Sequence, residues 1–311
     1  MIGWAIGFWG SLIVASALAL PILKLLAMLK SRQTVSAFVP EHAKKQGTPT
    51  MGGLIILAGA ITGIVGLGIY RFPQAWSYLL LLLGFGAIGF VDDYVVPKLM
   101  KGKRGLGWKQ KLAMQIVLAG VVLYLEGIKA PGSIALGVFL ILFFSNAYNF
   151  ADGLDALAGS IGVFLFLGLA AIGCIEGQTF VPAICLCLVG GFVPFLMLNA
   201  PPAKVFMGDV GALPIGATIG LLYMDSMSKV TDMPALWLGL AVLSIMMMAE
   251  LIPVPLQVAS VKLTGKRIFL KTPIHHGFET RGWPETRIVW RFAMVQLICS
   301  ALAVTIVGIW S

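Results

Sequence analysis

Long apolar stretches separated by short polar segments run through the whole chain. A membrane crossing needs about 20 apolar residues, and such stretches extend from Ile2 to Leu29 and lie near 51–70, 76–92, 112–127, 133–150, 158–175, 179–198, 211–226, 234–261 and 288–310. This pattern predicts an all-α polytopic membrane protein with about ten transmembrane helices. Several stretches abut, so one span fewer or one span more is an alternative. Residues 1–311 are expected to form a single membrane domain.

Composition and charge agree with this class and orient the helices. Hydrophobic residues make up 59% of the chain and charged residues only 11%, which is outside the usage of soluble domains. If the loop after the first stretch is cytoplasmic, only Arg71, Lys129 and Lys229 of the 22 Lys and Arg residues fall on the opposite side, with Lys24 inside the membrane. Cytoplasmic loops carry the excess of positive charge, so we expect both termini outside. The net charge of +9 then belongs to a basic membrane rim, and no nucleic-acid partner is predicted.

The segment "FVDDY" places Asp92 and Asp93 at the end of an apolar stretch. One interpretation is a helix end solvated at the membrane surface. The other is a site for a divalent cation or a general base, because hard cations prefer carboxylate oxygens. The basic segment "KLMKGKRGLGWKQK" that follows could offset the pair or bind phosphate. An isolated carboxylate pair does not decide between these interpretations.

Two further segments place polar side chains at the ends of predicted helices. In "SNAYNFADGLDALAG", Asn146, Asn149, Asp152 and Asp155 recur at intervals of three, which keeps neighbours on one helical face until Gly153 breaks the helix. Helix capping needs only one such side chain, so a ligand-binding face is favoured.

A ligand-binding role is also favoured for polar residues of the segment "NAPPAKVFMGDVGALPIG". Asn199 ends a stretch, and Gly208 and Gly211 flank Asp209 in a predicted turn that lets the backbone approach a ligand. Phe206 is a candidate to stack on a base, and an interfacial aromatic residue is the alternative.

Two more polar segments complete the candidate site. In "KTPIHHGFETRGWPE", His275 and His276 favour contact with phosphate or a carboxylate over zinc, because zinc sites need more ligands at recognisable spacings. In "EHAKKQGTPTMGG", Thr48 is a predicted N-cap followed by Pro49 at the first helical position. Lys45 and Thr50 are the candidates for ligand contact in this segment. Together the clusters predict a Mg²⁺ and phosphate site on the cytoplasmic side, suited to phosphosugar transfer between a nucleotide and a lipid.

The segments "GTPTMGG", "VDDY", "NAYNFADGLDALAG", "PAKVFMGDVG" and "PIHHGFETRGWPE" occur in this order between about Glu41 and Arg291. Together they resemble the phospho-N-acetylmuramoyl-pentapeptide-transferase family of the polyprenyl-phosphate N-acetylhexosamine-1-phosphate transferase superfamily. The resemblance implies a Mg²⁺-dependent transfer of phospho-MurNAc-pentapeptide from UDP-MurNAc-pentapeptide to undecaprenyl phosphate, which gives lipid I and UMP in peptidoglycan biosynthesis. It also implies a homodimer in the bacterial inner membrane with a cytoplasmic active site. Direct attack by the lipid phosphate is favoured over a covalent intermediate.

The resemblance also implies roles for single residues. Asp92 would be the base or activator for the lipid phosphate with Asp93 beside it, and Asp209 would be the metal ligand. His276 completes the expected catalytic set and matches a substrate-contacting position. In the expected nucleotide pocket, the Gly153 backbone and Asp155 would contact uracil. The other expected substrate-binding residues are Lys45, Thr50, Asn146, Asn149, Asp152, Asn199, Phe206, which would stack on uracil, and His275.

The chain departs from the family pattern at three positions, and two other functions remain as alternatives. Gly277 stands where the family has a third consecutive histidine, Ala151 replaces the usual threonine and Ala212 the usual serine. One alternative is the sister enzyme, a UDP-GlcNAc:undecaprenyl-phosphate GlcNAc-1-phosphate transferase. The other is an ion-coupled transporter with a midplane site at Glu250 and a span broken near 253–255.

Overall fold

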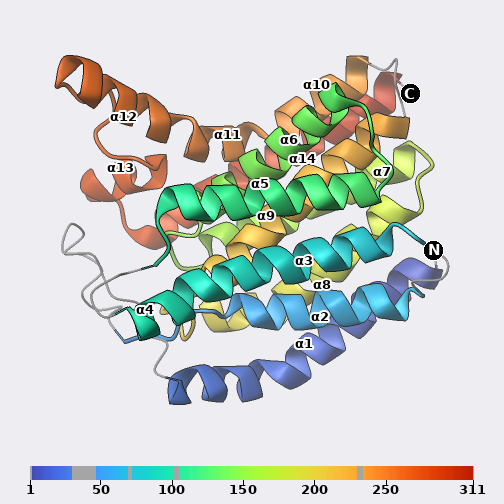
Figure 1. Ribbon diagram of the computed structural model, residues 1–311, viewed down its shortest axis with the longest axis horizontal. Coiled ribbons are helices and arrows are strands. Elements are labelled where there is room, and N and C mark those ends of the chain that lie inside the picture. The colour runs from blue at the N-terminus through green and yellow to red at the C-terminus, as the bar shows by residue number, and fades with distance from the viewer. Residues whose placement is uncertain (1, 30–46, 69–71, 101–104, 230–233, 311) are drawn as a thin grey trace.

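A computed structural model describes residues 2–29, 47–68, 72–100, 105–229 and 234–310, and its regular elements over these residues are helices (Figure 1). The helices are α1 (Ile2–Met28), α2 (Gly53–Gly66), α3 (Ala75–Phe90), the π-helical turn η3 (Val91–Val95), α4 (Val96–Leu99), α5 (Trp108–Leu125), α6 (Pro131–Ala151), α7 (Leu157–Ile175), α8 (Phe180–Asn199), α9 (Asp209–Lys229), α10 (Pro234–Leu243), α11 (Ile245–Leu251), α12 (Pro253–Thr264), α13 (Ile274–Thr280) and α14 (Glu285–Trp310).

The polytopic membrane class predicted from the sequence is confirmed. Over the described ranges, eight helices or helical runs are long and apolar enough to cross a membrane, among them Ala75–Leu99 (α3 to α4) and Ile245–Thr264 (α11 and α12), and α2 and α10 are shorter apolar helices. Every apolar stretch of the sequence coincides with a helix or a run of helices. α5 corresponds to the stretch near 112–127 but begins earlier, in the polar segment Trp108–Lys111.

The stretch near 234–261 is not one continuous helix but the three helices α10, α11 and α12. The Ser244 hydroxyl donates a hydrogen bond to the Leu240 carbonyl oxygen at 2.7 Å, a contact that competes with the helical ladder and bends helices. Pro253 and Pro255 then remove two backbone donors at the start of α12. As a result α12 projects away from the bundle (Figure 1).

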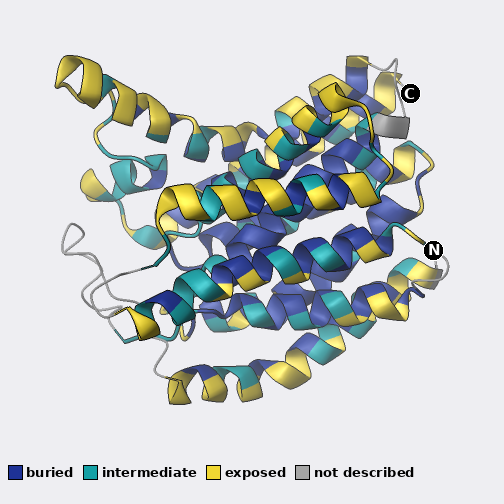
Figure 2. Ribbon diagram, in the orientation of Figure 1, coloured by how far each residue is buried: buried dark blue, intermediate teal, exposed yellow. Residues whose placement is uncertain are grey.

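The centre of the bundle is α9, which packs against α3 and α6. Its most apolar window is 89% buried, whereas that of α1 is only 22% buried. Figure 2 shows many exposed residues on α1, α5 and α12, and α14 also carries exposed apolar side chains such as Trp290 and Ile298. Exposed apolar residues on outer helices are what a lipid-facing surface requires, while the buried central helices carry the polar groups that must be paired.

Close packing of α6 against α9 sets the position of the candidate site. A Cβ atom at Gly216 would lie 2.3 Å from the Phe144 carbonyl oxygen, and one at Gly220 would lie 2.5 Å from the Ile141 Cα atom. Small residues let two helix backbones approach in this way. The pairing is antiparallel, so the end of α6 that carries Asn149 meets the start of α9.

Candidate active site

Three carboxylates converge at one end of the bundle. Asp92 and Asp93 belong to the π-helical turn η3, and Asp209 is the first residue of α9. One oxygen atom from each lies within 4.8 Å of the other two. A π-helical turn inside an α-helix is uncommon and occurs mostly at functional sites. Residues 117 positions apart in the sequence are thus brought together as hard oxygen donors.

Lys111 of α5 is the cation that holds this cluster together. Its Nζ atom lies 2.9 Å from Oδ2 of Asp92 and 2.5 Å from Oδ2 of Asp209. The Asn149 amide donates to Oδ1 of Asp209 at 2.6 Å, and the Leu106 backbone N–H donates to Oδ1 of Asp92 at 2.6 Å. The sequence pointed to a basic segment here but did not single out Lys111 from its neighbours.

Asp93 has a different environment from Asp92. Its Oδ2 atom accepts a hydrogen bond from the Val210 backbone N–H at 3.1 Å, in the first turn of α9, where backbone donors lack partners within the helix. A carboxylate at this end also interacts favourably with the helix dipole. Asp93 therefore fixes the start of α9 against α3, while Asp92 faces Lys111.

The turn before α9 requires a glycine at position 208. Gly208 has φ +71°, and a Cβ atom there would lie 2.6 Å from Asp93 Oδ2 and 2.6 Å from Thr50 Oγ1. Thr50 is thereby placed beside the carboxylates. The predicted turn flanked by two glycines is wrong in one respect, because Gly211 lies inside α9 and packs against Gly53 of α2.

Aspartates of the loop after α6 tie it to the segment before α9. Oδ2 of Asp152 accepts from the Gly208 backbone N–H at 3.0 Å, and Oδ2 of Asp155 accepts from the Ala203 N–H at 3.0 Å. The Asp155 backbone N–H in turn donates to Oε1 of Glu285 at 2.6 Å. Sequence reasoning missed Glu285, because an acidic residue in the first turn of a helix is usually explained by the helix dipole.

The three asparagine side chains of the polar segments differ in their position relative to the carboxylate cluster. Asn199 is buried and bridges the same loops, accepting from the Ala156 N–H at 2.9 Å and donating to the Val205 carbonyl at 2.8 Å. Asn146 lies one turn before Asn149 and donates to Oε1 of Gln115 at 3.1 Å. Hence Asn149 contacts the carboxylate cluster, and Asn146 and Asn199 shape its surroundings.

His275 lies inside the protein against the loop after α6. Its Nδ1 atom is 2.9 Å from Oε2 of Glu250, and both side chains are fully buried. A Cβ atom at Gly153 would lie 2.3 Å from His275 Nε2, so the imidazole occupies the space that a side chain there would need. Glu250 therefore lies at the same end of the bundle as the carboxylates, which argues against the midplane transport site.

His276 is only partly buried and pairs within its own helix. Its Nδ1 atom lies 2.5 Å from Oε2 of Glu279. Burial lowers the pKa of His276 and outweighs the opposing effect of Glu279. The lowered pKa favours the uncharged imidazole at neutral pH.

The segment around Thr50 is extended rather than helical. The Phe206 N–H donates to the Pro49 carbonyl at 2.9 Å, and the Gly52 N–H donates to the Phe206 carbonyl at 2.7 Å. The predicted helix start at Thr48 and Pro49 is therefore wrong, because α2 begins at Gly53. The backbone groups of Pro49 and Gly52 form hydrogen bonds with Phe206 instead of belonging to a helix. Lys45 lies outside the described residues.

The carboxylate cluster fits a divalent cation. Three half-buried carboxylates offer hard oxygen ligands, which Mg²⁺ prefers. Lys111 shares two of these carboxylates, so it competes with a metal ion for their oxygen atoms.

Comparison with known proteins gives a consistent result. Residues 75–227 match the model of glycosyl transferase family 4, and residues 45–57 match signature 1 of the phospho-N-acetylmuramoyl-pentapeptide-transferases. The chain is 40% identical to a phospho-N-acetylmuramoyl-pentapeptide-transferase of Heliobacterium modesticaldum, over 94% of this chain and 95% of the relative. It is 38% identical to the enzyme of that name from Lactobacillus acidophilus, over 86% of each, and 36% identical to that of Staphylococcus carnosus, over 92% of each.

Proposed function

The chain belongs to the phospho-N-acetylmuramoyl-pentapeptide-transferase family, and we propose that it transfers phospho-MurNAc-pentapeptide from UDP-MurNAc-pentapeptide to undecaprenyl phosphate. The products are lipid I and UMP. The observation that carries this proposal is the cluster of Asp92, Asp93 and Asp209 with Lys111. It lies beside Thr50, which is within the segment 45–57 that matches the family signature. The bilayer supplies the acceptor, and this end of the bundle faces the cytoplasm in the proposed topology, with both termini outside.

The reaction exchanges one phosphorus–oxygen bond for another. An oxygen of the undecaprenyl phosphate attacks the sugar-bearing phosphorus, and the bond from that phosphorus to the bridging oxygen breaks with its electron pair leaving on UMP. The attacking phosphate is already anionic, so direct attack needs no strong base and no covalent enzyme intermediate. Asp92 is proposed to activate the acceptor phosphate as a weak base, because its carboxylate lies beside Lys111 and, unlike that of Asp93, does not cap α9.

The carboxylates, the amide and the lysine of the site have different electrostatic roles. Asp209, with Asp92 and Asp93, would hold Mg²⁺, which when bound neutralises the diphosphate and the departing UMP. Asn149 keeps the Asp209 carboxylate in one orientation. Lys111 contributes a fixed positive charge next to the reacting phosphates, where charge in a partly buried site acts strongly.

The nucleotide end of the substrate is assigned to the loop after α6. Gly153 and Phe206 are both half-buried there; Gly153 offers its backbone, and Phe206 offers a ring for stacking. Asp152, Asp155, Asn146 and Asn199 shape this pocket through the hydrogen bonds described above. Lys45, Thr50, His275 and His276 are proposed to contact the remaining substrate groups, and the active protein is proposed to be a homodimer.

A UMP-release assay with the purified protein tests this function. Undecaprenyl phosphate is offered with UDP-MurNAc-pentapeptide or with UDP-GlcNAc, with and without Mg²⁺. We expect Mg²⁺-dependent release with the muramoyl substrate and a loss of at least about 100-fold in Asp209→Asn. Glu176→Gln is the matched control, because it neutralises one carboxylate at the far end of α7. Full activity of Asp209→Asn would contradict the site, and transfer of GlcNAc-1-phosphate without a muramoyl product would favour the sister enzyme.

A further inference from the structure

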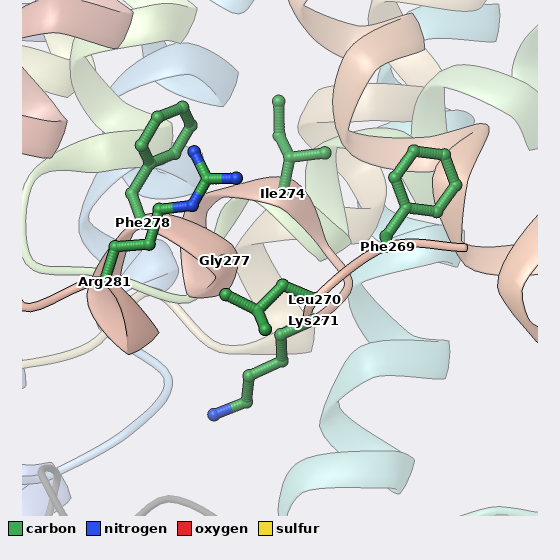
Figure 3. Close-up of a pocket in the computed structure, with 7 residues that line it drawn as sticks. All are labelled: Phe269, Leu270, Lys271, Ile274, Gly277, Phe278 and Arg281. Atoms are coloured by element: carbon green, nitrogen blue, oxygen red, sulfur yellow. The ribbon is translucent and has the colours of Figure 1, made fainter. Parts of the chain in front are cut away.

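A separate cavity of about 220 Å³ lies between α13 and the connection from α12 (Figure 3). Its lining residues are Phe269, Leu270, Lys271, Ile274, Gly277, Phe278 and Arg281. Four of them are large and apolar, and two are cations. Ile274, Gly277 and Phe278 of α13 and its C-cap Arg281 recur at i, i+3, i+4 and i+7, so they share one face of that helix. His275 is on another face, against Glu250 and Gly153, and the lining residues include none of the carboxylates of the active site.

Hydrogen bonds hold the walls of this cavity in place. Oε1 of Gln257 accepts from the backbone N–H groups of Ile268 and Phe269, both at 3.0 Å, and its Nε2 donates to the Phe269 carbonyl at 2.8 Å. On the other wall, the Phe278 ring packs against Trp283 with centroids 4.8 Å apart. The cavity is therefore preformed, as ligand sites usually are.

Both charged residues that line the cavity are cations. Lys271 and Arg281 form no ion pair with any described residue, and Figure 3 shows their side chains running to different sides of the cavity. The segment from Leu251 to Phe278 contains no Asp or Glu. The flanking acids Glu250 and Glu279 are bonded to the two histidines. An anion is the complementary occupant.

The surface next to the cavity is apolar and exposed. Its exposed side chains are Leu256, Val258, Val261, Leu263, Ile268 and Leu270. Leu263, which is 85% exposed, is followed by the cations Lys266 and Arg267. In a membrane protein such residues contact acyl chains, and cations at the end of an apolar helix lie at the level of the lipid headgroups. The cavity lies directly beside this transition.

We propose that this cavity binds an anionic phospholipid of the bilayer. The headgroup phosphate lies between Lys271 and Arg281, and the apolar walls receive the first part of an acyl chain. A phospholipid fits better than a soluble anion because the cations are combined with four apolar wall residues and an exposed apolar surface. This site is distinct from the transfer reaction, and its occupancy does not depend on the proposed function.

Native mass spectrometry of the detergent-purified full chain tests the proposal. The protein is titrated with phosphatidylglycerol, phosphatidylcholine, inorganic phosphate and undecaprenyl phosphate. We expect preferential binding of phosphatidylglycerol, weakened about fivefold by Lys271→Gln or Arg281→Gln and about 25-fold by both changes. Lys129→Gln, in the turn between α5 and α6 about 30 Å away along α6, is the control and should bind as the wild type does.

A second variant tests the role of the cavity volume independently of the two cations. A Cβ atom at Gly277 would meet only the Lys271 carbonyl, at an ordinary 3.5 Å, so Gly277→Leu can fold and fill the cavity while keeping both cations. We expect it to lose phosphatidylglycerol binding, with Gly277→Ala nearer the wild type. The proposal is wrong if the double charge variant or Gly277→Leu binds normally. It is equally wrong if inorganic phosphate binds as tightly, or if undecaprenyl phosphate displaces the phospholipid and the charge variants raise the KM for that substrate.

Discussion

Replacing Lys111 by methionine tests the electrostatics of the carboxylate cluster. The change keeps most of the apolar stem and removes the charge that lies 2.9 Å from Asp92 and 2.5 Å from Asp209. Each hydrogen bond between charged groups contributes about 1.5–3 kcal/mol. Desolvation of the lysine, whose side chain is only 20% exposed, cancels part of this, so we expect a net loss of about 2–4 kcal/mol.

Mg²⁺ should reverse much of this loss. Without Lys111 the carboxylate oxygens are open to the ion, and a ligand at about 100 times its Kd stabilises a protein by about 2.7 kcal/mol. Thermal unfolding of the purified protein in detergent, with EDTA or with saturating MgCl₂, measures both effects. Lys111→Met should have a lower Tm than the wild type in EDTA and should gain more from Mg²⁺.

Lys109→Met is the matched control for this experiment. Lys109 lies in the same turn of α5, but its ammonium group stacks on the exposed Trp108 ring, at 5.6 Å from the centroid. It should melt as the wild type does under both conditions. If Lys111→Met is as stable as the wild type in EDTA, or if Mg²⁺ raises the Tm of both proteins equally, then Lys111 does not compete with a cation for these carboxylates.

Three further predictions concern the surroundings of the site. Gly153→Ala should reduce UMP release at least about tenfold, because its Cβ would lie 2.3 Å from His275 Nε2, whereas Gly120→Ala, with no atom within 4 Å, should be neutral. Gly216→Ala should lower both Tm and activity by separating α6 from α9, and full activity at a reduced Tm would show that the Asn149–Asp209 contact does not depend on this packing. Because the pKa of His276 is lowered on folding, its contribution to stability is present above the unfolded value of about 6.5 and is lost as the pH falls from there through the lower folded pKa. The Tm difference between the wild type and His276→Gln should therefore become less favourable to the wild type between about pH 7.5 and 5.5, and a constant difference would contradict it.

The helical fold could be predicted because apolar length alone identifies membrane helices. The breaks within helices and the exact helix starts were harder to predict. Ser244 breaks the predicted span near 234–261 through a hydrogen bond to its own helix, and the sequence does not distinguish this from an ordinary buried serine. The helix start at Thr48 and Pro49 failed for a tertiary reason, since pairing with the Phe206 segment overrides local capping preferences.

The residue types of the candidate site could be predicted from the sequence, but their ion-pair and hydrogen-bond partners could not. Carboxylates and amides at helix ends are conspicuous in an apolar sequence, and Asp92, Asp93 and Asp209 do lie together. The partners Lys111, Glu250 and Glu285 come from other helices. One sequence offers many lysines and few criteria to choose among them, because charge pairing depends on three-dimensional proximity.

The charge balance of the site explains why the proposed function includes a divalent cation. Asp92, Asp93 and Asp209 are compensated by Lys111 alone among the contacts described. The proposed reaction brings a diphosphate and a phosphate monoester to the same place. Like charges at this separation repel by several kcal/mol in a partly buried site, so the substrates require more positive charge than one lysine supplies. Asp93, which caps α9, is the carboxylate least available to a lysine and thus the one whose charge most needs another counterion.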